Sequence, residues 1–190
     1  MKNISISRLT EQDLLSVVDF FRYTITDTYI KDGIDVSDEG DLNELIEKKK
    51  DHLNDDLSTN GSKRIFFLAK SDTKIIGTIS SATPTDSEQI IKLLSGIDLS
   101  DVADICDVYI LPEYQGKGVG TLLFNAMLLY LLGKGVKRFS LDSGYKLAVK
   151  YWTSRLGEPT RFFEDYWGKG EHQAVWVKDI VDVQLSYKVA

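Results

Sequence analysis

Residues 108–121 read Val-Tyr-Ile-Leu-Pro-Glu-Tyr-Gln-Gly-Lys-Gly-Val-Gly-Thr. The apolar residues at the start favour a buried strand, and Pro112 ends it because proline has no N–H to donate. Gly116, Gly118 and Gly120 allow the backbone a positive φ, and we expect a helix to begin directly after them. Backbone N–H groups beside the positive end of a helix bind anions, so this stretch predicts a phosphate site.

Two other phosphate-binding motifs resemble this stretch. A P-loop requires Ser or Thr directly after its Gly-Lys pair, but Lys117 is followed by Gly118. A dinucleotide-binding loop has its first glycine directly after the strand, whereas residues 112–115 intervene here. Asp142, after the next apolar run, stands where the ribose-binding acid of such a loop would lie. A nucleotide-dependent enzyme is therefore the first alternative.

The glycine loop is similar to motif A of the GNAT family of N-acetyltransferases. That pattern is Gln/Arg-x-x-Gly-x-Gly/Ala behind an aliphatic strand, and Gln115, Gly118 and Gly120 fill its fixed positions. The resemblance implies that the loop holds the pyrophosphate of coenzyme A and that the strand pairs with the pantetheine arm. The implied donor-binding residues are Val108, Tyr109, Ile110, Gln115, Gly116, Lys117, Gly118, Val119, Gly120 and Thr121.

The composition is that of an ordinary globular chain. Of the 190 residues, 43% are apolar and 27% charged, which suits one well-buried domain over residues 1–190. The net charge of −6 argues against nucleic acid as a partner, and no apolar run is long enough to span a membrane. Cys106 is the only cysteine, so a reducing cytoplasm is expected. One cysteine and two histidines without ligand spacing predict no metal site.

Hydrophobic periodicity predicts alternating strands and helices along the whole chain. We expect helices from Thr10 to about Thr24, between residues 32 and 56, and over 87–96, 121–132 and 145–156. Strands are expected at 4–8, 64–70, 74–81, 101–111, 136–141, 162–167, 173–178 and 181–185. Gly77 inside a strand indicates a bulge or a close backbone approach. This order resembles the GNAT fold, which is a single α/β domain whose mixed, twisted sheet is flanked by helices on both faces.

Three side chains are candidate catalytic residues. An amine must lose its proton before it can attack, and a carboxylate near the acyl group can accept that proton. Asp104 and Asp107 lie on the predicted central strand; we favour Asp104, although a bulge in that strand would change which of the two faces the site. Tyr151 could protonate the leaving thiolate, because Trp152 stands where the family carries a tyrosine. Water is the alternative acid.

The sequence thus predicts an N-acetyltransferase that moves an acetyl group from acetyl-CoA to an amine by direct attack. The acceptor is a small molecule or a peptide. The aromatic hairpin near the C-terminus could join two copies in a homodimer. The alternative is a catalytically inactive CoA-binding sensor or interaction module on the same fold, which the tryptophan at position 152 supports.

Overall fold

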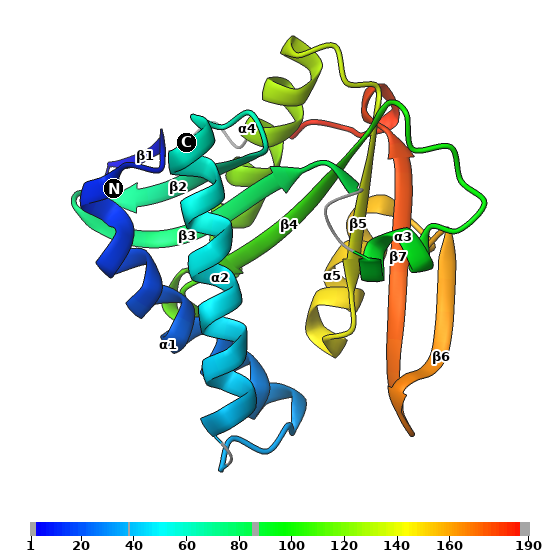
Figure 1. Cartoon of the computed structure of the whole chain (residues 1–190), viewed down its shortest axis with the longest axis horizontal. Helices are drawn as coiled ribbons and strands as arrows, with labels where there is room; N and C mark the ends of the chain where they lie inside the picture. Colours follow the sequence, from blue (N-terminus) through cyan, green and yellow to red (C-terminus); the bar gives the residue numbers. More distant parts are fainter. Residues whose placement is uncertain (1–2, 38, 85–87, 187–190) are drawn as a thin grey trace. The chain divides into compact units, whose positions relative to one another are not determined.

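The computed structural model describes residues 3–37, 39–84 and 88–186 (Figure 1). Its strands form one mixed sheet in the hydrogen-bonded order β1-β2-β3-β4-β5-β7-β6. The strands are β1 (Ile4–Arg8), β2 (Arg64–Ser71), β3 (Lys74–Ala82), β4 (Val102–Ile110), β5 (Arg138–Ser143), β6 (Arg161–Gly168) and β7 (Glu171–Asp179). The helices are α1 (Leu14–Asp32), α2 (Glu39–Thr59), α3 (Glu88–Leu93), α4 (Val119–Gly133) and α5 (Lys146–Leu156), with 3₁₀ turns η1 (Glu11–Asp13), η3 (Pro112–Tyr114) and η4 (Ile180–Asp182).

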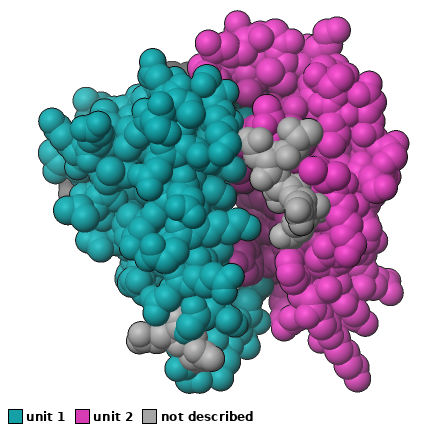
Figure 2. Space-filling model, viewed as in Figure 1, with its two compact units in different colours: residues 1–81, 107–127, 186–190 teal, residues 82–106, 128–185 magenta. Residues whose placement is uncertain are grey.

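The chain divides into two compact units (Figure 2). Unit 1 comprises residues 1–81, 107–127 and 186–190, and unit 2 comprises residues 82–106 and 128–185. The chain passes from unit 2 to unit 1 inside β4, between Cys106 and Asp107. The glycine loop and the start of α4 therefore belong to unit 1, whereas α5 belongs to unit 2.

In unit 1, helices cover both faces of the strands. The buried ring of Phe21 on α1 contacts Phe66 and Tyr109 edge-on, with ring centroids 6.3 and 5.6 Å apart. Ile110 follows Tyr109 and faces the opposite side, because successive strand residues alternate. A Cβ built on Gly77 would lie 2.8 Å from Ile110 and 2.9 Å from Leu123 of α4. Side chains rather than another backbone segment therefore approach Gly77 closely, and the lack of a Cβ there lets α4 pack directly on β3.

In unit 2, the first half of β4 runs parallel to β5. The pairing extends from Val102 opposite Arg138 to Ile105 opposite Leu141. Strand β7 continues the sheet antiparallel to β5, and β6 pairs antiparallel with β7. Leu93, Leu94 and Val175 form a small buried core in this unit.

Several predicted boundaries differ from the structure by a few residues, and the end of the first helix and the last strand differ most. Helix α1 continues to Asp32 rather than ending near Thr24, and Gly33 supplies its left-handed cap at φ 77°. The Thr24 hydroxyl bonds to the Phe20 carbonyl inside the helix. The strand predicted over residues 181–185 is wrong. Ile180 is buried and begins the turn η4, while Val181 is 78% exposed. Ile180 is the buried apolar residue of this segment, and the alternation that follows it does not form a strand.

Within the part of the chain that the structure describes, no helix combines the length and apolarity needed to cross a membrane.

Candidate active site

The glycine loop leaves β4 through the turn η3 and adopts a backbone that only glycine takes without strain. Gly116 has φ 69° and Gly118 has φ 87°. Nothing lies within 4 Å of a Cβ built on either residue, so the backbone conformation rather than packing requires glycine there. Gly120 does not adopt a positive φ, because it already lies in the first turn of α4.

The start of α4 offers the N–H groups of an anion site. The first helical hydrogen bond runs from the Leu122 N–H to the Gly118 carbonyl at 2.9 Å. The N–H groups of Val119, Gly120 and Thr121 come before it and have no partner within the helix, and they lie at the positive end of the helix dipole. The space beside Gly116 and Gly118 is open, and the N–H groups can donate to phosphate oxygens. Both features suit a phosphate group.

Side chains from two elements surround this loop. The Gln115 amide donates to the Ile110 carbonyl at 3.1 Å, which closes the loop onto the end of β4. The Lys31 ammonium, at the end of α1, lies 3.4 Å from the Gln115 amide oxygen. The Lys117 ammonium lies 5.6 Å from the ring centroid of Tyr114. Two cationic side chains therefore stand near the predicted phosphate position.

Asp107 marks an irregularity in β4, in the strand where a bulge was expected. Its φ is 52°, a left-handed conformation that is uncommon outside glycine. The Thr78 hydroxyl of β3 donates to the Asp107 carbonyl oxygen at 2.8 Å and helps to hold this backbone. Residues kept in such conformations by their surroundings concentrate at functional sites.

The Asp107 carboxylate is fully buried in unit 1 and surrounded by donors. Oδ1 accepts from the Lys49 ammonium at 2.6 Å, and Oδ2 accepts from the Ser80 hydroxyl at 2.6 Å. Oδ2 also lies 3.1 Å from Nδ1 of His52 and 3.4 Å from the Arg64 guanidinium. These groups come from α2, β2 and β3, so the cluster joins three elements to β4.

This environment decides the protonation state of Asp107. Burial alone would raise the pKa of the carboxyl, but the Lys49 charge, the hydrogen bond and charge of His52 and the Arg64 charge outweigh it and hold that pKa well below its usual range. A carboxylate with a lowered pKa is a weak proton acceptor. The surroundings of Asp107 therefore favour a positioning role over proton transfer.

The other two candidate catalytic residues lie in unit 2. Asp104 is 6% exposed and accepts a hydrogen bond from the Ser140 hydroxyl of β5 at 2.7 Å. Tyr151 of α5 is 41% exposed, and its ring meets that of Trp152 edge-on with centroids 4.8 Å apart. Trp152 is buried. Helix α5 thus turns the indole into unit 2 and the Tyr151 phenol toward the surface.

The sequence reasoning missed His52 as a partner of Asp107. Lys49 and His52 are three residues apart on α2, which places both on one helix face. This spacing is the signal that the sequence contains. The same segment holds many acidic residues, and the spacing alone identifies no partner on β4.

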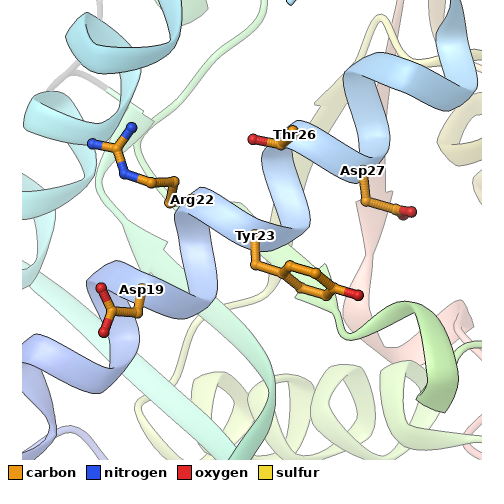
Figure 3. Close-up of a pocket in the computed structure, with 5 residues that line it drawn as sticks. All are labelled: Asp19, Arg22, Tyr23, Thr26 and Asp27. Atoms are coloured by element: carbon orange, nitrogen blue, oxygen red, sulfur yellow. The ribbon is translucent and has the colours of Figure 1, made fainter. Parts of the chain in front are cut away.

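A pocket of about 400 Å³ lies on α1 (Figure 3). Asp19, Arg22, Tyr23, Thr26 and Asp27 line it. Two of the charged groups there are engaged, because Asp27 pairs with Lys31 at 2.6 Å and Arg22 donates to Asn43 at 2.9 Å. None of the predicted donor-binding or catalytic residues lines this pocket, and we assign it no role.

Solved structures of known proteins share the fold of this chain. A GNAT-family chain from Desulfovibrio desulfuricans has a TM-score of 0.69 and 13% identity, covering 94% of this chain and 99% of its own length. PaiA N-acetyltransferase from Thermoplasma acidophilum, in complex with coenzyme A, gives 0.64 and 18%, covering 93% and 99%. The ribosomal-protein-S18-alanine N-acetyltransferase from Escherichia coli gives 0.61 and 15%, covering 99% of both chains.

At these identities the likeness shows the fold, and it confirms the expected mixed sheet with flanking helices. A search of curated proteins gave no match. The family model described as "Acetyltransferase (GNAT) family" matches residues 30–157, which is more than half of the chain and includes the glycine loop. The expected class, an acyl-CoA-dependent acetyltransferase, is thereby confirmed, and the chain belongs to the acetyltransferase (GNAT) family.

Proposed function

We propose that the protein transfers an acetyl group from acetyl-CoA to an amine by direct attack of the amine nitrogen. The observation that carries the proposal is the loop of Gly116 and Gly118, whose positive φ values precede the N–H groups at the start of α4. This arrangement suits the pyrophosphate of coenzyme A. A neighbour of the same fold, PaiA, is in complex with coenzyme A, which supports the choice of donor.

The donor site that we propose consists of two adjoining segments of unit 1. Residues 115–121 hold the pyrophosphate through backbone N–H groups, and residues 108–110 offer strand backbone to the pantetheine arm. The whole chain, residues 1–190, acts as one acetyl-CoA-binding domain in this proposal. Because the donor is held through backbone N–H groups in this proposal, we expect substitution of the glycines to lower its affinity more than substitution of any charged side chain.

The acceptor nitrogen must lose two protons during the reaction, and the leaving thiolate must gain one. The acceptor ammonium gives up a proton, and its nitrogen lone pair then attacks the thioester carbon while backbone N–H groups stabilise the developing oxyanion. The new C–N bond forms, the C–S bond breaks, and the nitrogen loses its second proton as the thiolate gains one. Asp104 is the carboxylate candidate for the first step, because the lowered pKa of Asp107 suits that residue to positioning, and Tyr151 or water supplies the last proton.

The acceptor that we propose is an amine of a small molecule or a peptide, and the cytoplasm is the proposed location. The chain carries net charge −6, which favours cationic acceptors over nucleic acid. Phe162 and Trp167 on β6 are 48% and 55% exposed, which suits a homodimer through the terminal hairpin. The molar mass measured by light scattering decides between monomer and dimer.

Calorimetric titration with acetyl-CoA tests the proposal, with NADH and ATP as control ligands. We expect saturable binding of acetyl-CoA alone, and a loss of more than about tenfold in affinity in Gly118→Trp. Gly170→Trp is a matched control, because Gly170 has a similar φ of 82° and equally open space on the β6–β7 turn. It should bind like the wild type.

The possible results separate the alternatives. Folded wild-type protein that does not bind acetyl-CoA overturns both the transferase and the sensor proposals. Binding that survives Gly118→Trp places the donor elsewhere. Binding without thiol release across a broad panel of amines favours the CoA-binding sensor.

A further inference from the structure

The imidazole of His52 has a defined orientation in unit 1. Its Nδ1 lies 3.1 Å from Oδ2 and 3.4 Å from Oδ1 of Asp107. An ionised carboxylate can only accept hydrogen bonds, so Nδ1 carries the hydrogen and donates it. In the neutral ring the lone pair then sits on Nε2, on the far side of the ring from Asp107. The His52 side chain is 17% exposed, so it is not sealed from solvent.

The carboxylate that orients this ring is itself fixed. Lys49 and Ser80 each donate to Asp107 at 2.6 Å, and its side chain is fully buried. Its lowered pKa keeps it ionised and therefore an acceptor at neutral pH. A buried carboxylate that holds Nδ1–H of a histidine and leaves Nε2 as the base is the arrangement of hydrolytic triads.

The cluster lies next to the proposed donor segment, where the reaction needs a base. Asp107 directly precedes Val108, the first residue proposed to pair with the pantetheine arm. The Lys49 ammonium lies 5.6 Å from the ring centroid of Tyr109, within that segment. All of these residues belong to unit 1. His52 is therefore joined through Asp107 to the segment that we propose pairs with the pantetheine arm.

We propose that His52 is the residue that accepts the proton of the acceptor amine, and that Asp107 is its positioning residue; this rests on the proposed acetyl transfer. Nε2 of His52 takes one proton from the acceptor ammonium, and the freed lone pair forms the C–N bond to the thioester carbon. The C–S bond breaks, and the remaining excess proton on nitrogen passes to the thiolate. The imidazolium then returns its proton to solvent.

The groups around the Asp107 carboxylate come from every element of the cluster. Lys49 lies on the same helix as His52, Arg64 lies on β2, and Ser80 of β3 contributes a neutral hydroxyl.

His52→Gln, compared with His172→Gln, tests the proposal. Glutamine retains an amide N–H for Asp107 but has no basic nitrogen. His172 is the only other histidine; its Nδ1 accepts from the Asp165 N–H at 3.1 Å on the β6–β7 hairpin. Thiol release from acetyl-CoA is followed at neutral pH with spermidine, kanamycin, alanine amide and a lysine-containing peptide.

We expect kcat/KM of His52→Gln to fall about 100-fold at neutral pH. The acetyl-CoA affinity of this variant, measured by calorimetry, stays at the wild-type value. His172→Gln keeps the wild-type rate. A His52→Gln variant with the wild-type rate overturns the inference and leaves the proposed function standing.

Nitrogen NMR of the histidine rings gives an answer that does not depend on the acceptor. We expect the neutral ring of His52 in the acetyl-CoA complex to carry its hydrogen on Nδ1, because Nδ1 lies 3.1 Å from Oδ2 of Asp107. A neutral ring with its hydrogen on Nε2 overturns the inference even if the panel contains no substrate. A wild-type protein that binds no acetyl-CoA overturns the proposed function, and with it the role of His52.

Discussion

Lys49 of α2 and Asp107 of β4 lie 58 positions apart in the chain, and their charged groups meet at 2.6 Å around a fully buried carboxylate. Such a pair stabilises a fold little more than apolar packing would, because both charges lose their hydration. Removing one partner is costly, since the other charge remains buried. The cluster around Asp107 is thus a place where a single substitution has a large effect.

Asp107→Asn should lower the free energy of unfolding by about 3–5 kcal/mol, because Lys49 and Arg64 would lose the anion between them. Urea unfolding at neutral pH measures this. Asp165→Asn is the control, because Asp165 shares the unusual backbone, with φ 52° in both residues, but its side chain is 57% exposed. The control should change stability little. Equal losses in both variants would contradict the attribution of the cost to the buried charge.

The lowered pKa of Asp107 also predicts how stability depends on pH. The folded carboxyl has a pKa well below the ordinary 3.8, which the unfolded chain regains. Below that value the unfolded chain binds the proton and the folded protein does not, so acid favours unfolding. The stabilisation is present above about pH 4 and is lost as pH falls further. Urea midpoints between about pH 6 and pH 3 should fall more steeply in the wild type than in Asp107→Asn, and parallel curves would contradict this.

The glycine loop and the family could be predicted from the sequence because they depend on neighbouring residues. Gly116 and Gly118 must precede the helix by fixed distances, and Pro112 must follow the strand, so the motif is complete within one short segment. The close approach at Gly77 could be inferred for a similar reason, since glycine weakens a strand and is favoured there mainly where the strand bulges or another segment comes close.

The proton-transfer residues could not be predicted in this way. His52 becomes a candidate only when α2 lies beside β4, and nothing in the order of residues gives that distance. The sequence favoured Asp104 over Asp107, but a bulge in the strand would change which of the two faces the site. The structure separates them because the positive φ at Asp107 interrupts the alternation that strand periodicity assumes.

Gly77→Val should destabilise unit 1 by about 1–3 kcal/mol, because the new side chain overlaps Ile110 and Leu123, which approach its Cβ position to 2.8 and 2.9 Å. It should also weaken acetyl-CoA binding, since α4 would move away from β3 with its N-terminal donors. Thermal unfolding and calorimetry measure the two effects. Gly133→Val is the control, because nothing lies within 4 Å of a Cβ there. Unchanged affinity for acetyl-CoA in Gly77→Val would show that donor binding does not depend on how α4 packs against β3.

Asp56→Ala should cost about 1–3 kcal/mol, because this fully buried carboxylate accepts from the Phe66 N–H and from Arg8, each at 2.7 Å. The amide would remain buried without its partner, whereas the partly exposed Arg8 can regain water. Asp55→Ala is the neighbouring control, since Asp55 pairs with Lys63 at 2.9 Å at the surface. Urea unfolding should show a clear loss for Asp56→Ala only, and similar values for both would argue against the buried hydrogen bond.

Tyr151→Phe tests whether the phenol protonates the leaving thiolate. The side chain is 41% exposed, so its loss should leave the melting temperature unchanged. If the phenol is the acid, kcat falls about 100-fold while the affinity for acetyl-CoA stays constant. Trp152→Phe gives the opposite pattern, because the buried indole supports packing and has no acidic proton. A Tyr151→Phe variant with the wild-type kcat would assign the last proton to water.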